Sequence, residues 1–227
     1  MKVAIMYSGG KDSTMALKYA LDQRWKVEAL ISVKPRSTES FLYQYATVEW
    51  TRLSSKALGI PVIHINSEKI GPKEEADELE GVFSKLNVDK ILVGGVGLQA
   101  TQIREWKRVA GKFGIELMVP YGSLSSEELF EKTINSGFDI MLTDVASDGL
   151  GPEWLGRKLN KSSFEEFKEM SKEFGFDILG EGGYYNTFVV DGSIFKKKIE
   201  FTEQIKKWDA KTSSGYLEVK NAVLRSK

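Results

Sequence analysis

The chain contains no cysteine and only one histidine, His64, among its 227 residues. Without cysteine it can form no disulfide, no thiolate-bound metal site and no mechanism that uses a thiol of its own. The single histidine argues against a His-based catalytic triad and against a metal site built from several histidines. The sequence therefore excludes the cysteine-dependent classes of enzyme and disfavours the histidine-dependent ones.

Long hydrophobic runs and an excess of one charge are also missing. No apolar stretch approaches the roughly 20 residues that span a bilayer, and the amino terminus lacks the features of a signal peptide. Lysine plus arginine equals aspartate plus glutamate, at 32 each, whereas non-specific nucleic-acid binders normally carry a basic excess. We therefore expect a cytoplasmic protein with no membrane segment and no stable nucleic-acid partner.

Short apolar runs alternate with longer helical patterns through residue 143. Strands are expected at residues 3–7, 26–33, 61–65, 90–94, 116–119 and 139–143. Helices are expected at residues 11–24, 40–58, 73–86, 99–113 and 125–136. This alternation is typical of βαβ units, so it predicts an α/β fold with a Rossmann-like parallel sheet.

The pattern changes near Ser147, where a glycine-rich stretch begins. A helix is expected at residues 163–174, and strands at 187–190, 194–201 and 216–224. We therefore predict two domains, a parallel α/β domain over residues 1–146 and a smaller α+β domain, largely antiparallel, over residues 147–227. Ligands of open α/β sheets bind beyond the carboxyl ends of strands where the strand order reverses, and the segments SGGKDS and GGVG follow two such ends.

The segment SGGKDS, residues 8–13, joins the first expected strand to the first expected helix. Two glycines at a helix start leave backbone N–H groups unpaired at the positive end of the helix dipole, a geometry that suits a phosphate. The spacing is neither that of a Walker A loop nor G-x-G-x-x-G. The alternative interpretation is a glycine turn in which Asp12 or Ser13 caps the helix.

The segment resembles the pyrophosphate-binding loop, SGGxDS, of the N-type ATP pyrophosphatases, which belong to the PP-loop superfamily with an adenine nucleotide alpha hydrolase-like fold. The resemblance implies cleavage of ATP between its α- and β-phosphates. It implies that nucleotide is bound by the residues of this loop and by residues at two further strand ends, namely Ser8, Gly9, Gly10, Lys11, Asp12, Ser13, Ile31, Gly94 and Gly95. It further implies that Lys11 and Asp12 act in catalysis and that Asp12 helps to hold Mg²⁺.

A second segment, GEGGYYNTFVVDG at residues 180–192, resembles the distal motif of the diphthine–ammonia ligase family, and GLGPEWLGRKL at residues 149–159 is similar to another segment of that family. The resemblance covers nearly the whole chain. It implies an AMP-forming ligase that uses ATP and ammonium to amidate diphthine, a modified histidine of translation elongation factor two.

The distal segments supply candidate residues for the acyl substrate. Glu181 can orient ammonium or take a proton from it, Asn186 and Thr187 can bind a carboxylate or imidazole, and Arg157 can face the diphthine carboxylate or a phosphate. Structural roles remain open for two of them, a turn cap for Glu181 and an ion pair for Arg157. Asp144 and Asp148, which follow an expected strand, are further candidates for Mg²⁺, and Trp154 is expected in the core.

Two departures from the family pattern keep other functions open. Tyr184 stands where the family has a second glutamate, and SFLYQY at residues 40–45 lacks the histidine of a related segment. The alternatives are an enzyme that adenylates RNA or another metabolite and a non-catalytic adenine-nucleotide-binding module. Assembly into a homo-oligomer is a further expectation that the sequence leaves open.

Overall fold

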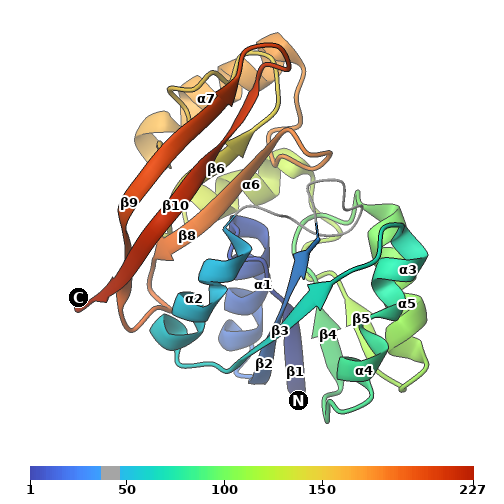
Figure 1. Cartoon of the computed structure of the whole chain (residues 1–227). Helices are drawn as coiled ribbons and strands as arrows, with labels where there is room; N and C mark the ends of the chain where they lie inside the picture. The colour runs from blue at the N-terminus through green and yellow to red at the C-terminus, as the bar shows by residue number, and fades with distance from the viewer. Residues whose placement is uncertain (37–46) are drawn as a thin grey trace.

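The molecule is built around two β-sheets (Figure 1). Its structure is a computed structural model, which describes residues 1–36 and 47–227. In those residues the first sheet has the order β3-β2-β1-β4-β5, and its neighbouring strands are parallel. Its strands are β1 (Lys2–Met6), β2 (Lys26–Pro35), β3 (Val62–Ser67), β4 (Lys90–Leu92) and β5 (Glu116–Met118).

The second sheet is antiparallel and comes from the later part of the chain. Its order is β7-β6-β10-β9, and β8 also pairs with β6. Its strands are β6 (Asp139–Val145), β7 (Lys158–Leu159), β8 (Tyr185–Asp191), β9 (Lys198–Asp209) and β10 (Ser214–Arg225). The predicted fold class, a Rossmann-like parallel α/β sheet followed by a smaller α+β part, is therefore confirmed.

Helices cover both faces of the parallel sheet. They are α1 (Lys11–Asp22), the 3₁₀ helix η1 (Val48–Trp50), α2 (Thr51–Leu58), α3 (Pro72–Asp77), α4 (Glu80–Phe83) and α5 (Ala100–Gly111). Successive side chains of a strand point to opposite faces. Accordingly Val3 and Ile5 of β1 pack in the core that α1 and α2 share, whereas Ala4 and Met6 pack with α3, α4 and α5. The sheet is thus buried on both sides, as parallel sheets usually are.

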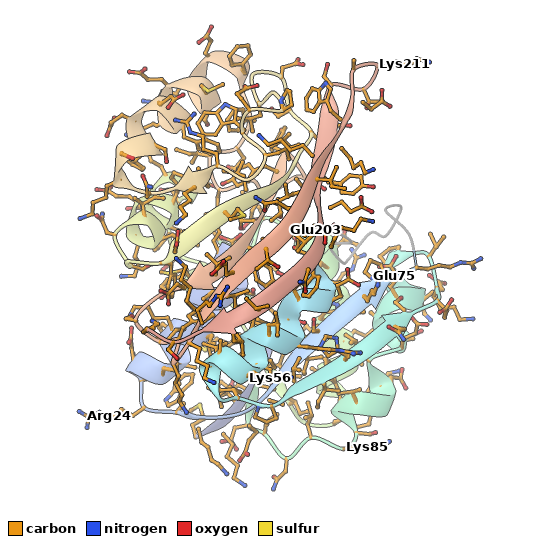
Figure 2. All side chains as sticks on the ribbon, turned by 60° about the vertical axis from the view of Figure 1, so that its left-hand side comes forward. Arg24, Lys56, Glu75, Lys85, Glu203 and Lys211 are labelled. Carbon is orange, nitrogen blue, oxygen red and sulfur yellow. The ribbon has the colours of Figure 1, made fainter. Side chains whose placement is uncertain are left out.

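The two sheets share one continuous core. The hydrophobic cluster that contains Val3 and Leu17 continues to Phe188 of β8 and Ile199 of β9. It also includes α6 (Ser126–Ile134) and α7 (Lys161–Phe174), which lie behind the second sheet in Figure 1. The β9–β10 hairpin runs along the second sheet, where Gly215 and Tyr216 pair with β6, and Figure 2 shows Lys211 at its tip. The first sheet therefore meets the second through α1 and α2, beside the loop that follows β1.

Three predicted helices differ from the structure. The helix expected at 73–86 is two short ones, because residues around Leu79 make i→i+3 hydrogen bonds instead of i→i+4 bonds. Of the helix expected at 40–58, the described part becomes helical at Val48, directly after Thr47, which has a left-handed φ of 62°. The segment SFLYQY lies outside the described residues. The remaining helix, expected at 163–174, begins earlier, at Lys161, with Asn160 as its cap.

The strand predictions contain two errors of pairing and extent. Residues 139–143, expected in the parallel sheet, form β6 of the antiparallel sheet, where they pair with β7, β8 and β10. The strand expected at 194–201 begins only at Lys198 and continues to Asp209, through mostly polar residues that are exposed from Thr202 onward and carry no core pattern. The short β7 was not predicted. The domain boundary placed between residues 146 and 147 stays a prediction.

A search of the helices within residues 1–36 and 47–227 found none with the length and apolar character needed to cross a membrane.

Candidate active site

A cavity of about 840 Å³ opens at the carboxyl edge of the parallel sheet, against β8. Its lining comes from the loops after β1 and β4, from the turn before β8, and from the first residues of β8 itself. The strand order reverses between β1 and β4, because β2 lies on one side of β1 and β4 on the other. Such a reversal is the usual ligand site of an open α/β sheet, and the volume suits a nucleotide-sized molecule.

The loop after β1 has the backbone that a phosphate site needs. Gly9 has a φ of +84°, in the left-handed region that favours glycine. Gly10 precedes α1 in extended conformation, so the helix begins at Lys11 with its first N–H groups at the loop. Ser13 Oγ donates to the carbonyl of Gly10 and lies 3.4 Å from Ser8 Oγ. Both hydroxyls therefore lie at the helix start, where an anion is favoured.

Strand β8 braces this loop from the other sheet. The amide of Val189 donates to the carbonyl of Gly9 at 2.8 Å, and the amide of Lys11 donates to Thr187 Oγ1 at 3.1 Å. A Cβ on Gly9 would lie 2.4 Å from the ring of Phe188. The glycine is thus needed for close approach of β8 as well as for its backbone angle, and the loop conformation depends on the second sheet.

The Lys11 side chain is almost completely buried, with 3% of its surface exposed. Its Nζ donates to Asp12 Oδ2 at 2.8 Å and to the carbonyl of Leu179 at 2.5 Å, and it lies 4.9 Å from the centre of the Tyr185 ring. Leu179 belongs to the turn before β8. The predicted role of Lys11 at the phosphates stays a prediction, and the contacts of its ammonium group lie with the protein instead.

Asp12 and Glu181 both line the cavity, and each has one buried carboxylate oxygen without a hydrogen-bond partner among the described residues, Asp12 Oδ1 and Glu181 Oε2. Glu181 is 9% exposed, and its other oxygen accepts a hydrogen bond from the amide of Val96 at 2.7 Å. Burial raises the pKa of Glu181, and the charges of Asp12 and Asp177 raise it further. Unsatisfied buried oxygens are costly, so this pair is suited to a cation or a proton donor.

The loop after β4 closes the opposite side of the cavity through two glycines. A Cβ on Gly94 would lie 2.4 Å from the backbone of Asp12, and a Cβ on Gly95 would lie 2.4 Å from Glu181 Oε1. Gly95 also has a φ of +84°. These glycines therefore let the loop after β4 touch both the loop after β1 and the turn that carries Glu181.

Apolar side chains form another wall. Ile31 of β2 lines the cavity together with Met6, Val33 and Val93, and Ile31 is 1% exposed. An apolar wall beside the SGGKDS loop suits the flat face of an adenine ring. The structure thus brings Ile31, Gly94 and Gly95 to the same cavity as the SGGKDS loop.

Asn186 and Asp144 lie on neighbouring antiparallel strands and also line the cavity. They are paired residues of β8 and β6, so their side chains project from the same face of the sheet. Burial raises the pKa of Asp144 to about 6. Of the predicted substrate residues, Asn186 and Thr187 therefore lie at the cavity, and the hydroxyl of Thr187 is already bonded to the loop.

Three residues named from the sequence do not line the large cavity. Arg157 forms an ion pair with Glu166 and stacks on Trp154 at 4.0 Å, which supports the structural interpretation of this arginine. Trp154 is 1% exposed, as expected of a core residue. Asp148 lines a separate small depression beside Tyr184. The predicted contact of Arg157 with substrate stays a prediction, without support from its position.

Tyr184 stands where the family motif has a second glutamate, and its surroundings show whether this position belongs to the cavity. Its ring lies 6.3 Å from that of Phe176, and its carbonyl accepts from the amide of Ala146. It is not among the residues that line the large cavity within the described chain. The departure from the family pattern at this position therefore leaves the carboxylates of the cavity in place.

The sequence did not identify three contributors to the site. Asp177 Oδ1 accepts hydrogen bonds from the amides of Leu179 and Glu181, which shapes the turn before β8. Tyr185 lies against the ammonium of Lys11. Residues 98–102 form part of the cavity rim. Local sequence patterns give no signal for these contacts, since they depend on the packing of distant segments.

Metal binding was tested on the donor atoms present. A search of residues 1–36 and 47–227 found no group of three or more histidine or acidic side chains arranged to hold a metal ion. The unpartnered Asp12 Oδ1 nonetheless suits Mg²⁺, which commonly takes one or two carboxylates and completes its shell with phosphate oxygens and water.

Comparisons with known proteins agree with this geometry. The family model for the diphthamide synthase N-terminal domain matches residues 1–117, and that for the diphthamide synthase C-terminal domain matches residues 125–224. These ranges contain the SGGKDS loop and Glu181, respectively.

Curated relatives align over most of the chain. A human protein named diphthine–ammonia ligase is 28% identical over 221 residues, which cover 88% of this chain and 82% of the human one. The zebrafish protein of that name is 27% identical, covering 88% of this chain and 86% of its own length. The fission yeast protein of that name is 28% identical over 98% of this chain but extends well beyond it, since the match covers 40% of its length. The resemblance found in the sequence is thus confirmed, and the chain belongs to the diphthamide synthase family.

Proposed function

We propose that the protein is an ATP-dependent ligase that converts diphthine on translation elongation factor two to diphthamide with ammonium, releasing AMP and pyrophosphate. The observation that carries this proposal is the shared cavity, in which a phosphate-binding loop lies beside the buried, partly unsatisfied Glu181. Relatives named diphthine–ammonia ligase support the choice of substrates.

ATP binds with its adenine against the apolar wall at Ile31 and its phosphates at the amino terminus of α1. The backbone amides of the loop and the hydroxyls of Ser8 and Ser13 donate to the phosphate oxygens. A carboxylate oxygen of diphthine attacks the α-phosphorus, the bond from that phosphorus to the bridging oxygen breaks, and pyrophosphate leaves with the electron pair. Stabilising the departing charge at the loop lowers the barrier to this step.

Asp12 is the residue proposed to hold Mg²⁺, because it lines the cavity and its Oδ1 is buried and unpartnered among the described residues. A magnesium ion there supplies charge neutralisation for the phosphates. Lys11 neutralises the other oxygen of the same carboxylate, and this holds the Asp12 side chain in one orientation.

Glu181 is the residue proposed to act on ammonium. Its Oε1 is fixed by the amide of Val96, and its Oε2 is buried without a hydrogen-bond partner among the described residues. Ammonium gives a proton to Glu181, the ammonia nitrogen attacks the acyl carbon, and the carbon–oxygen bond to AMP breaks, with AMP taking the electron pair. The nitrogen then loses one more proton to solvent to give the amide. A carboxylate with a raised pKa suits this role because it accepts the proton more readily.

The acyl substrate approaches from the side of β8 in this proposal. Asn186 lies at the cavity and offers an amide that can bind a carboxylate or an imidazole. The two predicted domains then divide the reaction, with ATP held mainly by residues 1–146 and the acceptor by residues 147–227. A cytoplasmic location fits a substrate that takes part in translation, and it stays a prediction together with the oligomeric state.

The test uses the protein with Mg-ATP, ammonium and elongation factor two that carries diphthine. AMP is followed by chromatography, and the modified peptide is followed by mass spectrometry for conversion of the carboxyl group to an amide. The proposal expects AMP only when both ammonium and the factor are present. AMP formed without the factor contradicts the proposed acceptor, and bound ATP without turnover supports the nucleotide-binding alternative. An Asp12→Asn variant, assayed across magnesium concentrations, tests the metal.

A further inference from the structure

The side chain of Lys11 starts in the phosphate-binding loop but ends in the other half of the site. Its ammonium group contacts Asp12 Oδ2, the carbonyl of Leu179 and the face of the Tyr185 ring. An ammonium group has three N–H donors, and these three contacts account for them. With 3% of the side chain exposed, the charge is tolerable only because it is paired and hydrogen-bonded.

The residues that bind Lys11 belong to the turn that carries Glu181. Asp177 Oδ1 holds this turn together by accepting from the amides of Leu179 and Glu181. Glu181 is in turn fixed to the loop after β4 by the amide of Val96. The contact from Lys11 to Leu179 therefore ties the phosphate-binding loop to the segment that positions Glu181.

Charge supports the same arrangement. Three carboxylates of two segments lie close enough to influence one another, Asp12 on α1 and Asp177 and Glu181 on the turn. Lys11 is the buried cation in contact with both segments. To reach a phosphate, its ammonium group would have to give up its hydrogen bonds to Asp12 Oδ2 and to the carbonyl of Leu179.

We propose that Lys11 is a positioning residue that locks the turn of residues 177–181 against the phosphate-binding loop, and that it does not bind the phosphates of ATP. This replaces the role given to Lys11 from the sequence. Lys11 keeps Asp12 and Glu181 at the same cavity, so that the nucleotide and ammonium are bound at adjacent points. The proposal depends on the proposed function only for its assay of transfer.

The first test uses the wild-type protein and an amine-reactive acylating reagent, with and without magnesium and α,β-methylene-ATP. Mass spectrometry measures the modification of each lysine, and the exposed Lys56 and Lys211 serve as internal references (Figure 2). We expect Lys11 to stay unmodified in both conditions while the references react. Modification that nucleotide suppresses would show a phosphate contact, and modification in both conditions would show that the buried contact does not exist; either result overturns the proposal.

The second test compares Lys11→Met with Lys18→Met, a matched change on the same helix at an exposed ion pair with Asp22. Calorimetry with the methylene analogue measures nucleotide affinity, and AMP release measures turnover. We expect Lys11→Met to keep the affinity within about threefold, to lower kcat at least tenfold and to raise the KM for ammonium, because Glu181 loses its fixed position. We expect Lys18→Met to change none of these.

A loss of nucleotide affinity of about 10- to 150-fold in Lys11→Met, as expected for a deleted charge-assisted hydrogen bond to phosphate, contradicts the proposal. Hydrogen exchange adds a readout of the turn, since the amides of residues 179–183 should exchange faster in Lys11→Met than in Lys18→Met. If Lys11→Met does not fold, the labelling of wild-type protein still tests whether Lys11 is buried and whether it contacts nucleotide. If wild-type protein forms no AMP, the proposed function fails, whereas labelling and affinity still test Lys11.

Discussion

The amide of Val96 donates a hydrogen bond of 2.7 Å to Glu181 Oε1, and this contact joins the loop after β4 to the turn before β8. The bond occupies one carboxylate oxygen, whereas Oε2 is buried and has no hydrogen-bond partner among the described residues. Glu181 is therefore both anchored and available, a combination that a residue of purely structural role would not need. Variants of Glu181 and of Gly95 separate the anchoring of this side chain from its chemistry.

Replacing Glu181 with glutamine removes the proton acceptor but keeps an oxygen that can accept from Val96. We expect ATP affinity to change by no more than about twofold and amide formation to fall by roughly 10² to 10⁴, the usual range for loss of a general base. Because burial and the charges of Asp12 and Asp177 raise the pKa of Glu181, wild-type activity should fall as pH drops through that raised pKa. Equilibrium nucleotide binding and AMP release against pH measure both effects.

The control for this variant is Glu200→Gln, on an exposed strand residue that pairs with Arg225. It should leave the rate and the pH profile as in wild type. If Glu181→Gln retains the rate and the acid limb of the wild-type profile, then Glu181 does not take the proton. If it unfolds the protein, the role of Glu181 in the turn is structural, as one interpretation of the sequence held.

Alanine at Gly95 tests whether turnover depends on the close approach of the loop after β4 to Glu181, in addition to the backbone strain that the substitution introduces. Both Gly95 and Gly114 have positive φ values, +84° and +69°, so alanine at either should cost about 1–2 kcal/mol of stability. Only at Gly95 would the new Cβ meet a side chain, at 2.4 Å from Glu181 Oε1, whereas nothing lies within 4 Å of a Cβ at Gly114. We expect Gly95→Ala to lower turnover at least tenfold and Gly114→Ala to leave it unchanged.

Thermal unfolding and AMP release measure these two variants together. Equal losses of activity would mean that strain alone accounts for the effect. Full activity in Gly95→Ala would mean that Glu181 tolerates displacement, which contradicts the anchoring described above.

How far the sequence predicted the site depends on how local each signal was. The SGGKDS loop was identified because strand, turn and helix are contiguous in the chain, and its backbone follows from Gly9 and Gly10. The sequence did not predict which residues the Lys11 ammonium contacts, because its partner Leu179 lies 168 residues away in the chain.

The same lack of a local signal explains the error in strand pairing. Residues 139–143 read correctly as a strand, but their partners β8 and β10 come later in the chain, and apolar pattern alone does not say which sheet a strand joins.

We expect the protein to tolerate Tyr184→Glu, which introduces the residue of the family motif, without a gain in activity. Its ring packs near Phe176, beside a small depression that is separate from the large cavity. We expect Tyr184→Glu to change the amidation rate less than about threefold and to cost about 1 kcal/mol of stability, because a charge replaces a half-buried ring. Tyr184→Phe, which keeps the ring, is the control. A gain of tenfold or more in Tyr184→Glu would show that this position serves the reaction.

Asp144 should make stability depend on pH. Burial raises its pKa from 3.8 to about 6, so the folded state holds this proton more tightly than the unfolded state. The resulting contribution to stability is fully present below about pH 4 and is lost as pH rises to about 6. In Asp144→Asn this loss is absent. The unfolding free energy of the variant relative to wild type should therefore rise by about 1–3 kcal/mol between pH 4 and pH 7, since each pKa unit corresponds to about 1.4 kcal/mol.

Urea unfolding at several pH values measures this difference, and the exposed Glu203 of β9, labelled in Figure 2, supplies the control Glu203→Gln. The control should follow the wild-type pH profile. A difference between Asp144→Asn and wild type that stays constant from pH 4 to pH 7 would mean that the Asp144 carboxyl titrates near its ordinary value. In that case water or a cation reaches it from the cavity, and its burial beside Asn186 is less complete than the paired strands imply.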